Sequence, residues 1–197
     1  MFDEFRVYFE LGFRHIADLA GYDHILFVAA LAIPFSIGDW RRLAILVTAF
    51  TIGHSLTLAL ATLRLVSVPS QLVETLIPAT ILFTALDAYT SATPQRPENP
   101  VTLRRYGAAL LFGLIHGLGF STYLRALLGS EESIAWPLLA FNVGLEIGQL
   151  VILSIVLAVG ATLVPTIFPR RRWVQLSVAV TGGLALMLLV QRLGAWS

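Results

Sequence analysis

Residues 135–164 have the sequence AWPLLAFNVGLEIGQLVILSIVLAVGATLV, and this run decides the class of fold. Glu146 is the only charged residue in it. A transmembrane helix needs ~20 consecutive apolar residues. The run is therefore long enough to cross a bilayer with some tilt, or to end at Pro165, because proline blocks helix continuation. The sequence predicts a membrane-spanning α-helix here.

Other apolar runs of the same character occupy most of the remaining chain, at 16–36, 43–63, 69–90, 106–128 and 173–195. The 197 residues are 57% hydrophobic and only 13% charged, whereas soluble domains are roughly half apolar and a quarter charged. We therefore predict an all-α, polytopic integral membrane protein with six transmembrane helices, forming a single membrane domain over residues 1–197. No convincing internal repeat is evident.

The first residues, MFDEFRVYFELGFRHI, carry apolar side chains at spacings of three and four, with charges between them. This pattern predicts an amphipathic interfacial helix over residues 1–15. The segment is acidic and has no uninterrupted apolar centre, which is unlike a secretory signal. We expect the mature chain to begin at Met1.

Arginine distribution predicts the orientation in the membrane. All 13 residues of the Lys and Arg class are arginine, and the predicted loops divide them eight against five. One side carries Arg41, Arg42, Arg96, Arg104, Arg105, Arg170, Arg171 and Arg172, and the other carries Arg6, Arg14, Arg64, Arg125 and Arg192. Cytoplasmic loops are enriched in Lys and Arg. We therefore expect the first side to be cytoplasmic, in a bacterial inner membrane, with both termini outside.

Composition also limits the chemistry. The chain has no cysteine, which excludes disulfides, thiolate metal sites and cysteine nucleophiles, and two methionines are too few for a copper(I) relay. The net charge of +1 gives no reason to expect a nucleic acid partner. The expected partners are the lipid bilayer and a metal ion.

Polar residues inside the apolar runs are the candidate functional groups. A charged side chain at the bilayer centre costs at least ~2.5–3.5 kcal/mol, so such groups usually face the bundle interior and have partners. At 1.5 Å per residue, His54 and His116 lie roughly 15–16 Å from the cytoplasmic ends of their runs, and Glu146 lies roughly 16 Å from the outer end. Asp23 and His24 lie roughly 10–12 Å from the outer end of the first run. We predict that these groups meet near the midplane.

Three imidazoles and two carboxylates suit a first-row divalent cation, Ni²⁺, Co²⁺, Zn²⁺ or Fe²⁺. The predicted ligands are Asp23, His24, His54, His116 and Glu146. Neighbouring side chains on a helix point about 100° apart. Asp23 and His24 can therefore both bind one ion only if Gly21 distorts the turn. Otherwise one of them binds the ion and the other contacts that ligand. Residues expected to contact the ligands or line the pathway are Asn142, Gln149, Ser55, Asp87 and His15.

His15 is the weakest member of this set. On a continuous helix it stands half a revolution away from His24, and it is expected near the membrane surface. Asp87 is expected at the cytoplasmic end of its helix, where it could simply cap that end. The glycine pairs Gly113/Gly117 and Gly144/Gly148 have the small-xxx-small spacing that lets helices approach closely.

Other functions remain open at this point. The same residues could hold a catalytic zinc ion with Glu146 as general base, which would make the protein an intramembrane metallohydrolase. They could instead form a buried hydrogen-bond network in a structural accessory subunit, without metal. Ser55 next to His54 suggests a serine hydrolase, but residues i and i+1 do not face each other on a helix, and no GxSxG turn is present.

Four motifs together resemble the HupE/UreJ family of polytopic membrane proteins, in particular its second branch. They are GYDHILFVAAL (21–31), FTIGHSLTLAL (50–60), FGLIHGLGF (112–120) and FNVGLEIGQL (141–150). The family's His-x5-Asp-His pattern corresponds here to Asp23 and His24, but seven residues rather than five separate His15 from Asp23. The resemblance implies a nickel or cobalt permease serving hydrogenase or urease, with metalloenzyme maturation proteins as possible partners. Our leading hypothesis is a permease that moves a divalent cation inward.

Overall fold

The computed structural model describes residues 2–91, 102–128 and 134–195. Within these ranges the regular structure is entirely helical. The elements are α1 (Phe2–Ile16), α2 (Asp23–Ala32), the short 3₁₀ helix η1 (Ile37–Asp39), α3 (Trp40–Thr62), α4 (Ser70–Ser91), α5 (Leu103–Leu128), α6 (Ala135–Thr166) and α7 (Arg170–Gly194). The all-α prediction is confirmed. Arg96, which the sequence assigns to a loop between the runs at 69–90 and 106–128, lies outside the described residues.

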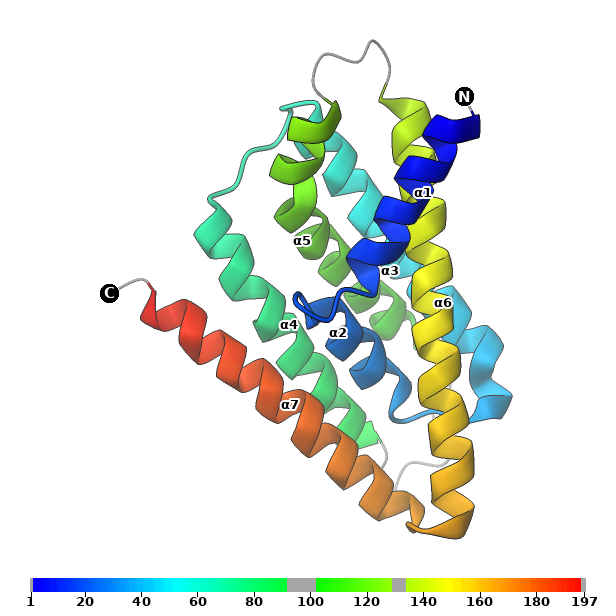
Figure 1. Ribbon diagram of the computed structural model, residues 1–197. Helices are drawn as coiled ribbons and strands as arrows, with labels where there is room; N and C mark the ends of the chain where they lie inside the picture. The colour runs from blue at the N-terminus through cyan, green and yellow to red at the C-terminus, as the bar shows by residue number, and fades with distance from the viewer. Residues whose placement is uncertain (1, 92–101, 129–133, 196–197) are drawn as a thin grey trace.

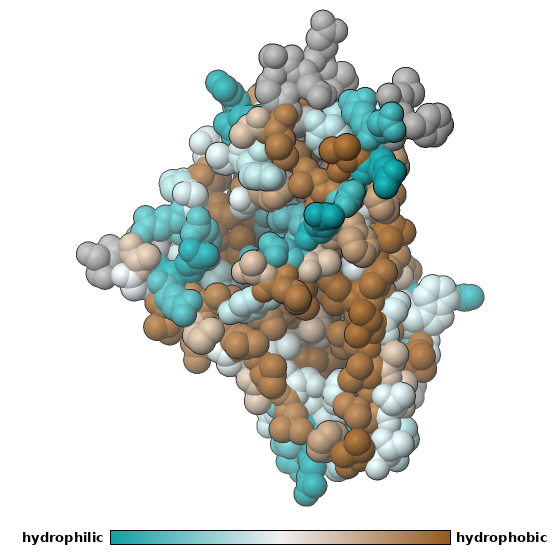
Figure 2. All heavy atoms as spheres, in the orientation of Figure 1, coloured by the Kyte–Doolittle hydropathy of each residue, from teal (hydrophilic) through white to brown (hydrophobic). Residues whose placement is uncertain are grey.

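Five of the described helices, α3 to α7, are long and apolar enough to cross a membrane. Their bounds agree within a few residues with five of the six predicted runs. Figure 2 shows hydrophobic side chains over much of the lower flank, including the long ridge of α6, whereas hydrophilic side chains lie at the lower tip, near the end of α7 and along α1 in the upper half. The helices and this surface indicate a membrane protein.

The predicted first span, 16–36, is not a single helix. α1 ends at Ile16, and α2 covers only Asp23–Ala32. Ten residues rise about 15 Å, half of the ~30 Å hydrocarbon core, so α2 cannot cross the membrane alone. A sixth continuous span is therefore not confirmed. Figure 1 shows α1 and α2 following one another in the same general direction, with the break near the middle of the molecule.

α1 packs along α6, so the predicted interfacial helix is also not confirmed. The buried positions Tyr8, Gly12 and Ile16 recur every fourth residue on one face of α1. A Cβ on Gly12 would overlap the carbonyl oxygen of Phe141 in α6. The apolar stripe that the sequence assigns to the lipid surface is thus used in part for contact with another helix, because glycine permits the two backbones to touch.

α3 and α5 form a second pair with the same kind of crossing. A Cβ on Gly53 would overlap the carbonyl oxygen of Leu110, and one on Gly113 would overlap that of Phe50. Gly117 lies against His54 in the same way. The predicted close approach at the glycine pairs is confirmed. It also holds the backbone of α3 at His54 against α5 near His116.

The remaining long helices, α4 and α7, pack against each other, and α4 also contacts α2 and α5. An aromatic layer in the core is formed by Phe27 of α2, Phe50 of α3 and Phe112 of α5. The ring centroids of Phe27 and Phe50 are 4.6 Å apart, and those of Phe27 and Phe112 are 6.2 Å apart. This layer lies next to the imidazoles described below.

Candidate metal centre

The four histidines of the chain lie together. His24 is at the centre: its ring centroid is 4.7 Å from that of His15, 5.1 Å from that of His116 and 5.8 Å from that of His54. The His15 and His54 centroids are 5.9 Å apart. The rings come from four different helices, α1, α2, α3 and α5. The side chains of His54 and His116 are almost completely buried.

His15 joins this cluster because the first helix is broken. The expected half-turn between His15 and His24 holds only for a continuous helix, and residues 17–22 are not helical. The chain turns there with the backbone N–H of Ala20 donating to Asp18 Oδ1 at 2.8 Å. The break brings the last turn of α1 and the first turn of α2 together. The expectation that His15 lies half a revolution away from His24 is wrong, because the ring centroids are 4.7 Å apart.

Most imidazole nitrogens of the cluster are buried without a hydrogen-bond partner among the described residues. They are His15 Nε2, His24 Nε2, His54 Nδ1, His54 Nε2 and His116 Nδ1. An unsatisfied buried polar group costs about 1–3 kcal/mol. Five such atoms would together cost about 5–15 kcal/mol, which is as large as the whole stability of a typical domain. The cluster therefore needs something that binds nitrogen lone pairs or N–H groups.

Thr80 of α4 sets the tautomer of His116. Thr80 Oγ1 is 2.7 Å from the carbonyl oxygen of Ile77 and 3.0 Å from His116 Nε2. A hydroxyl has one hydrogen, and the carbonyl takes it because a carbonyl can only accept. His116 Nε2 must then donate to Thr80, which leaves the lone pair on Nδ1 free. Metal-binding histidines are commonly oriented by such a bond from their other nitrogen.

The spacing of the rings fits coordination, whereas their present orientations do not. With Zn–N bonds of ~2.1 Å, two imidazoles at a tetrahedral angle have centroids about 5 Å apart. All four distances, 4.7, 5.1, 5.8 and 5.9 Å, lie within 1 Å of this value. In the part of the chain that the structure describes, no three His, Asp or Glu side chains converge on one metal position as placed. Rotation about the broad Cβ–Cγ torsions of histidine would turn the nitrogens inward without moving the helices.

Glu146 belongs to a separate polar contact between α6 and α3. Its Oε1 accepts a hydrogen bond from Thr48 Oγ1 at 2.6 Å, and its Oε2 accepts one from Thr51 Oγ1. Thr51 Oγ1 is also 2.7 Å from Oε1 of the buried Gln149. Thr51 precedes His54 by one turn of α3, so this contact borders the cluster along that helix. The structure thus pairs Glu146 and Gln149 with threonines rather than with the imidazoles.

The other sequence-predicted residues have defined positions. Ser55 donates to the carbonyl oxygen of Thr51 at 2.7 Å, so its hydroxyl is used within α3. Asn142 is partly buried, and its Oδ1 has no partner among the described residues. Asp23 lines a pocket of about 100 Å³ together with Glu74 and Arg192, which form an ion pair of 2.7 Å. Asp23 therefore lies between His24 and the ends of α4 and α7.

A larger hollow reaches His15 from the surface. Its volume is about 640 Å³, and it is lined by the end of α1, including Arg14 and His15, by the exposed Asp18 and by Phe120 and Tyr123 of α5. Asp18 is a residue that the sequence reasoning missed. The sequence signal for Asp18 is its position shortly before Gly21, because an aspartate in an Asx turn can end a helix there. The hollow gives the cluster an entrance with one carboxylate on its wall.

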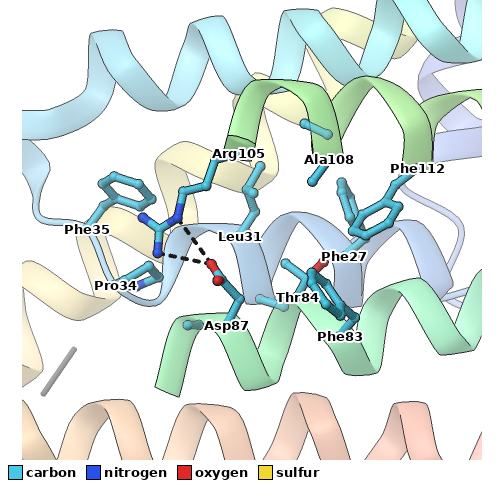
Figure 3. A pocket seen from close by; sticks show the side chains of 13 residues that line it. Phe27, Leu31, Pro34, Phe35, Phe83, Thr84, Asp87, Arg105, Ala108 and Phe112 are labelled. Carbon is cyan, nitrogen blue, oxygen red and sulfur yellow. Dashed lines mark hydrogen bonds and ion pairs between the residues drawn. The ribbon is translucent and has the colours of Figure 1, made fainter. Parts of the chain in front are cut away.

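Asp87 lies in a different pocket, shown in Figure 3, beyond the aromatic layer. Its carboxylate forms ion pairs of 2.7 Å with Arg104 and 3.0 Å with Arg105. Arg105 also lies over the ring of Phe35, with its guanidinium carbon 5.6 Å from the ring centroid. Asp87 thus links α4 to α5. It is not a helix cap alone, and it is not part of the imidazole cluster.

Phe27 separates the two regions. Its ring centroid is 5.4 Å from that of His116, and its side chain also lines the pocket that contains Asp87. Phe50 contacts the same imidazole, with ring centroids 5.1 Å apart. The cluster is therefore open toward the hollow at His15 and closed toward the Asp87 pocket by aromatic rings.

Comparison with known proteins supports the family resemblance. The family model described as HupE / UreJ protein matches residues 1–192. Neither the curated proteins nor the solved structures compared with the chain gave a match. The match covers every histidine of the cluster and all seven α-helices apart from the last residues of α7. The chain belongs to the HupE/UreJ family.

Proposed function

We propose that this protein is a membrane permease that binds a first-row divalent cation, Ni²⁺, Co²⁺ or Zn²⁺, through His15, His24, His54 and His116. The observation that carries the proposal is the group of five buried imidazole nitrogens without partners around His24. Neutral imidazole is a common ligand for these ions. The HupE/UreJ family is associated with nickel and cobalt transport, which agrees with this chemistry.

The acids have different roles in this proposal. Asp23 adjoins His24 and offsets the charge of the cation, either as a ligand or through that histidine. Asp18 attracts cations into the hollow at His15. Glu146 and Gln149 hold α6 against α3 through Thr48 and Thr51, and they position His54 rather than bind the ion. This assignment departs from the sequence-based ligand set, which includes Glu146 and omits His15.

The orientation of the site in the membrane follows from the arginine distribution in this proposal. The arginine-rich side is cytoplasmic in this proposal, as the positive-inside rule favours. The hollow at His15 then faces outward, and the Asp87 pocket faces inward. Transported metal would become available to metalloenzyme maturation proteins on the cytoplasmic side.

The test measures binding and uptake separately. Wild-type protein in detergent is titrated with Zn²⁺, Co²⁺ and Ni²⁺ by calorimetry, and the same protein in liposomes is assayed for uptake of the radioactive ions. His116→Ala should lose binding and uptake together. Ser154→Ala is the control, because Ser154 is exposed on α6 and, among the described residues, its hydroxyl bonds only to Leu150 of its own helix.

Three results would overturn the proposal. If the wild-type protein neither binds nor takes up any of the three ions, it is not a permease for these metals. If the wild type and His116→Ala bind the ions equally well, the histidine cluster is not the binding site. If the protein binds an ion tightly and stoichiometrically but does not take it up into liposomes, it holds a resident metal ion and is not a permease.

A further inference from the structure

Two pairs of helices cross at glycines, at Gly12 and Gly144 and at Gly53 and Gly113, and the same backbone atoms meet at both crossings. A Cβ on Gly12 would overlap the carbonyl oxygen three residues before Gly144 and lie 3.1 Å from the amide nitrogen one residue after it. A Cβ on Gly53 has the same relation to Gly113, with 3.0 Å to the corresponding nitrogen. The reciprocal contacts also agree, since Gly144 and Gly113 each meet the carbonyl three residues before the partner glycine. The two helix pairs, α1–α6 and α3–α5, are thus built alike.

Local sequence supports an equivalence between the two halves of the chain. Of the four glycines at the two crossings, only Gly12 on α1 and Gly113 on α5 are followed three residues later by histidine, whereas Gly53 on α3 and Gly144 on α6 are not; Phe-x-x-Gly does not separate the helices, because it ends at Gly12 as well as at Gly53 and Gly144. α1 therefore corresponds to α5, and α3 corresponds to α6. In chain order, α4 then corresponds to α7, and these two helices pack on each other.

The halves have opposite directions. In Figure 1, α1 and α6 run downward side by side, whereas α3 and α5 run upward. The helices α1, α3 and α4 thus correspond to α5, α6 and α7 in inverted orientation, with α1 packed against α6 and α5 against α3, while α2 has no counterpart among the described residues of the second half. Inverted halves are common in secondary transporters, which bind substrate near the midplane between them, often beside a broken helix.

The contacts within and between the pairs differ in kind. Within a pair the backbones touch at glycine, so the helices cannot slide without separating. Between the pairs, α3 and α6 meet through the side chains of Thr48, Thr51, Glu146 and Gln149. Hydrogen bonds of this type can be exchanged for bonds to water when an interface opens. Relative motion is therefore easiest between the pairs.

The histidines span this movable boundary. His15 belongs to the α1–α6 pair, and His54 and His116 belong to the α3–α5 pair. His24, on the short α2, lies between them. An ion bound to ligands of both pairs favours the arrangement that brings the pairs together, because a ligand shifts an equilibrium by its difference in affinity for the two states.

We infer that α1–α6 and α3–α5 are two rigid bodies that move against each other in alternating access, with the cation bound across their boundary. This inference rests on the proposed function and names the moving parts of the same site. In the described state the hollow at His15 is open and the layer of Phe27, Phe50 and Phe112 is closed. Movement of the pairs opens this layer toward the Asp87 pocket and closes the hollow.

Spin-label distances test the inference directly. The chain has no cysteine, so each double-cysteine variant carries only its two labels. Val7, Ile52, Leu111 and Leu139 are exposed on α1, α3, α5 and α6 respectively. The variants V7C/L139C and I52C/L111C measure distances within a pair, and V7C/L111C and I52C/L139C measure distances between pairs. Continuous-wave and pulsed EPR are recorded in lipid nanodiscs with and without Zn²⁺, which is diamagnetic.

The expected result separates the two kinds of distance. Distances within a pair keep their mean and width when Zn²⁺ is added. Distances between pairs are broader without metal, and on addition of Zn²⁺ they shift by more than the width of the within-pair distributions. Introducing His24→Ala into the between-pair variants abolishes the shift.

Two outcomes would overturn the two-body inference. One is a Zn²⁺-dependent change within a pair that equals the change between pairs. The other is equal widths for both kinds of distance without metal, together with no shift when calorimetry shows that Zn²⁺ is bound. Failure of the proposed function has a different signature, since Zn²⁺ would not bind at all. In that case the widths of the distance distributions measured without metal still show whether the two helix pairs are rigid bodies.

Discussion

Thr80→Val is the substitution that examines the metal centre most directly. Thr80 Oγ1 accepts the Nε2–H of His116 at 3.0 Å and donates to the carbonyl oxygen of Ile77. Valine has nearly the same shape but no hydroxyl, so His116 loses the bond that fixes its tautomer and ring orientation. Loss of such a bond to a metal ligand typically lowers metal affinity by about 10–100-fold, equivalent to about 1.4–2.7 kcal/mol.

Thr84→Val is the matched control for this substitution. Thr84 lies one turn further along α4, is similarly buried, and bonds only to the carbonyl oxygen of Thr80 at 2.8 Å. Its loss should change protein stability by about as much as that of Thr80, without changing metal affinity. The assay is calorimetric titration of both variants and the wild type with Zn²⁺ in the same detergent.

The pair of variants gives a clear refutation. If Thr80→Val binds Zn²⁺ with the wild-type dissociation constant, His116 does not use Nδ1 toward the metal with Nε2 held by Thr80. If both variants weaken binding equally, the effect comes from packing of α4 and not from the orientation of the imidazole. Only selective weakening by Thr80→Val agrees with the geometry described above.

Three further predictions concern the stability of the fold, measured by SDS titration of the protein in mixed micelles. Gly53→Ala should destabilise by about 1–3 kcal/mol through overpacking, because its Cβ would lie 3.0 Å from the nitrogen of Leu114 and overlap a carbonyl oxygen, whereas Gly107→Ala, with nothing within 4 Å of the new Cβ, should be neutral or stabilising; equal losses would contradict the glycine crossing. Arg64→Gly should stabilise by about 1 kcal/mol, because Arg64 has φ of 61° at the end of α3, a conformation that costs non-glycine residues about 1–2 kcal/mol; a loss of stability would mean that its side chain makes a larger contribution. Asp87→Asn should destabilise by about 1.5–3 kcal/mol by weakening charged hydrogen bonds to Arg105, which is 12% exposed, while Glu74→Gln should cost at most about 1 kcal/mol because its ion pair is half exposed; the opposite order would show that burial does not decide the strength of these pairs.

Much of the membrane architecture follows from local sequence. The runs that became α3 to α7 are apolar over at least the thickness of a bilayer, and in lipid a helix is the structure that satisfies all backbone hydrogen bonds within one segment. Their bounds are therefore predictable within a few residues. The depths of His54 and His116 follow from the same arithmetic, because rise per residue is constant along a helix.

The first helix could not be predicted in the same way. Residues 16–36 are apolar enough to resemble a span, and the signals for a break, Asp18 and Gly21, are weak without knowledge of neighbouring helices. The last turns of α1 also lie against a helix that is distant in sequence, through the close approach of Gly12 to Phe141 in α6. The sequence therefore predicts His15 to be remote from His24, whereas the structure places its ring 4.7 Å from that of His24.

The sequence by itself determined that this chain is helical, that it belongs in a membrane, and that histidines lie well inside several apolar segments, because hydropathy and helical rise are local properties. Only the tertiary structure decided which side chains meet. It joined His15 to the cluster, paired Glu146 with threonines, and placed two similar glycine crossings in opposite directions. These features depend on contacts between helices that are far apart in sequence. The local sequence of one helix does not indicate which other helix it will contact.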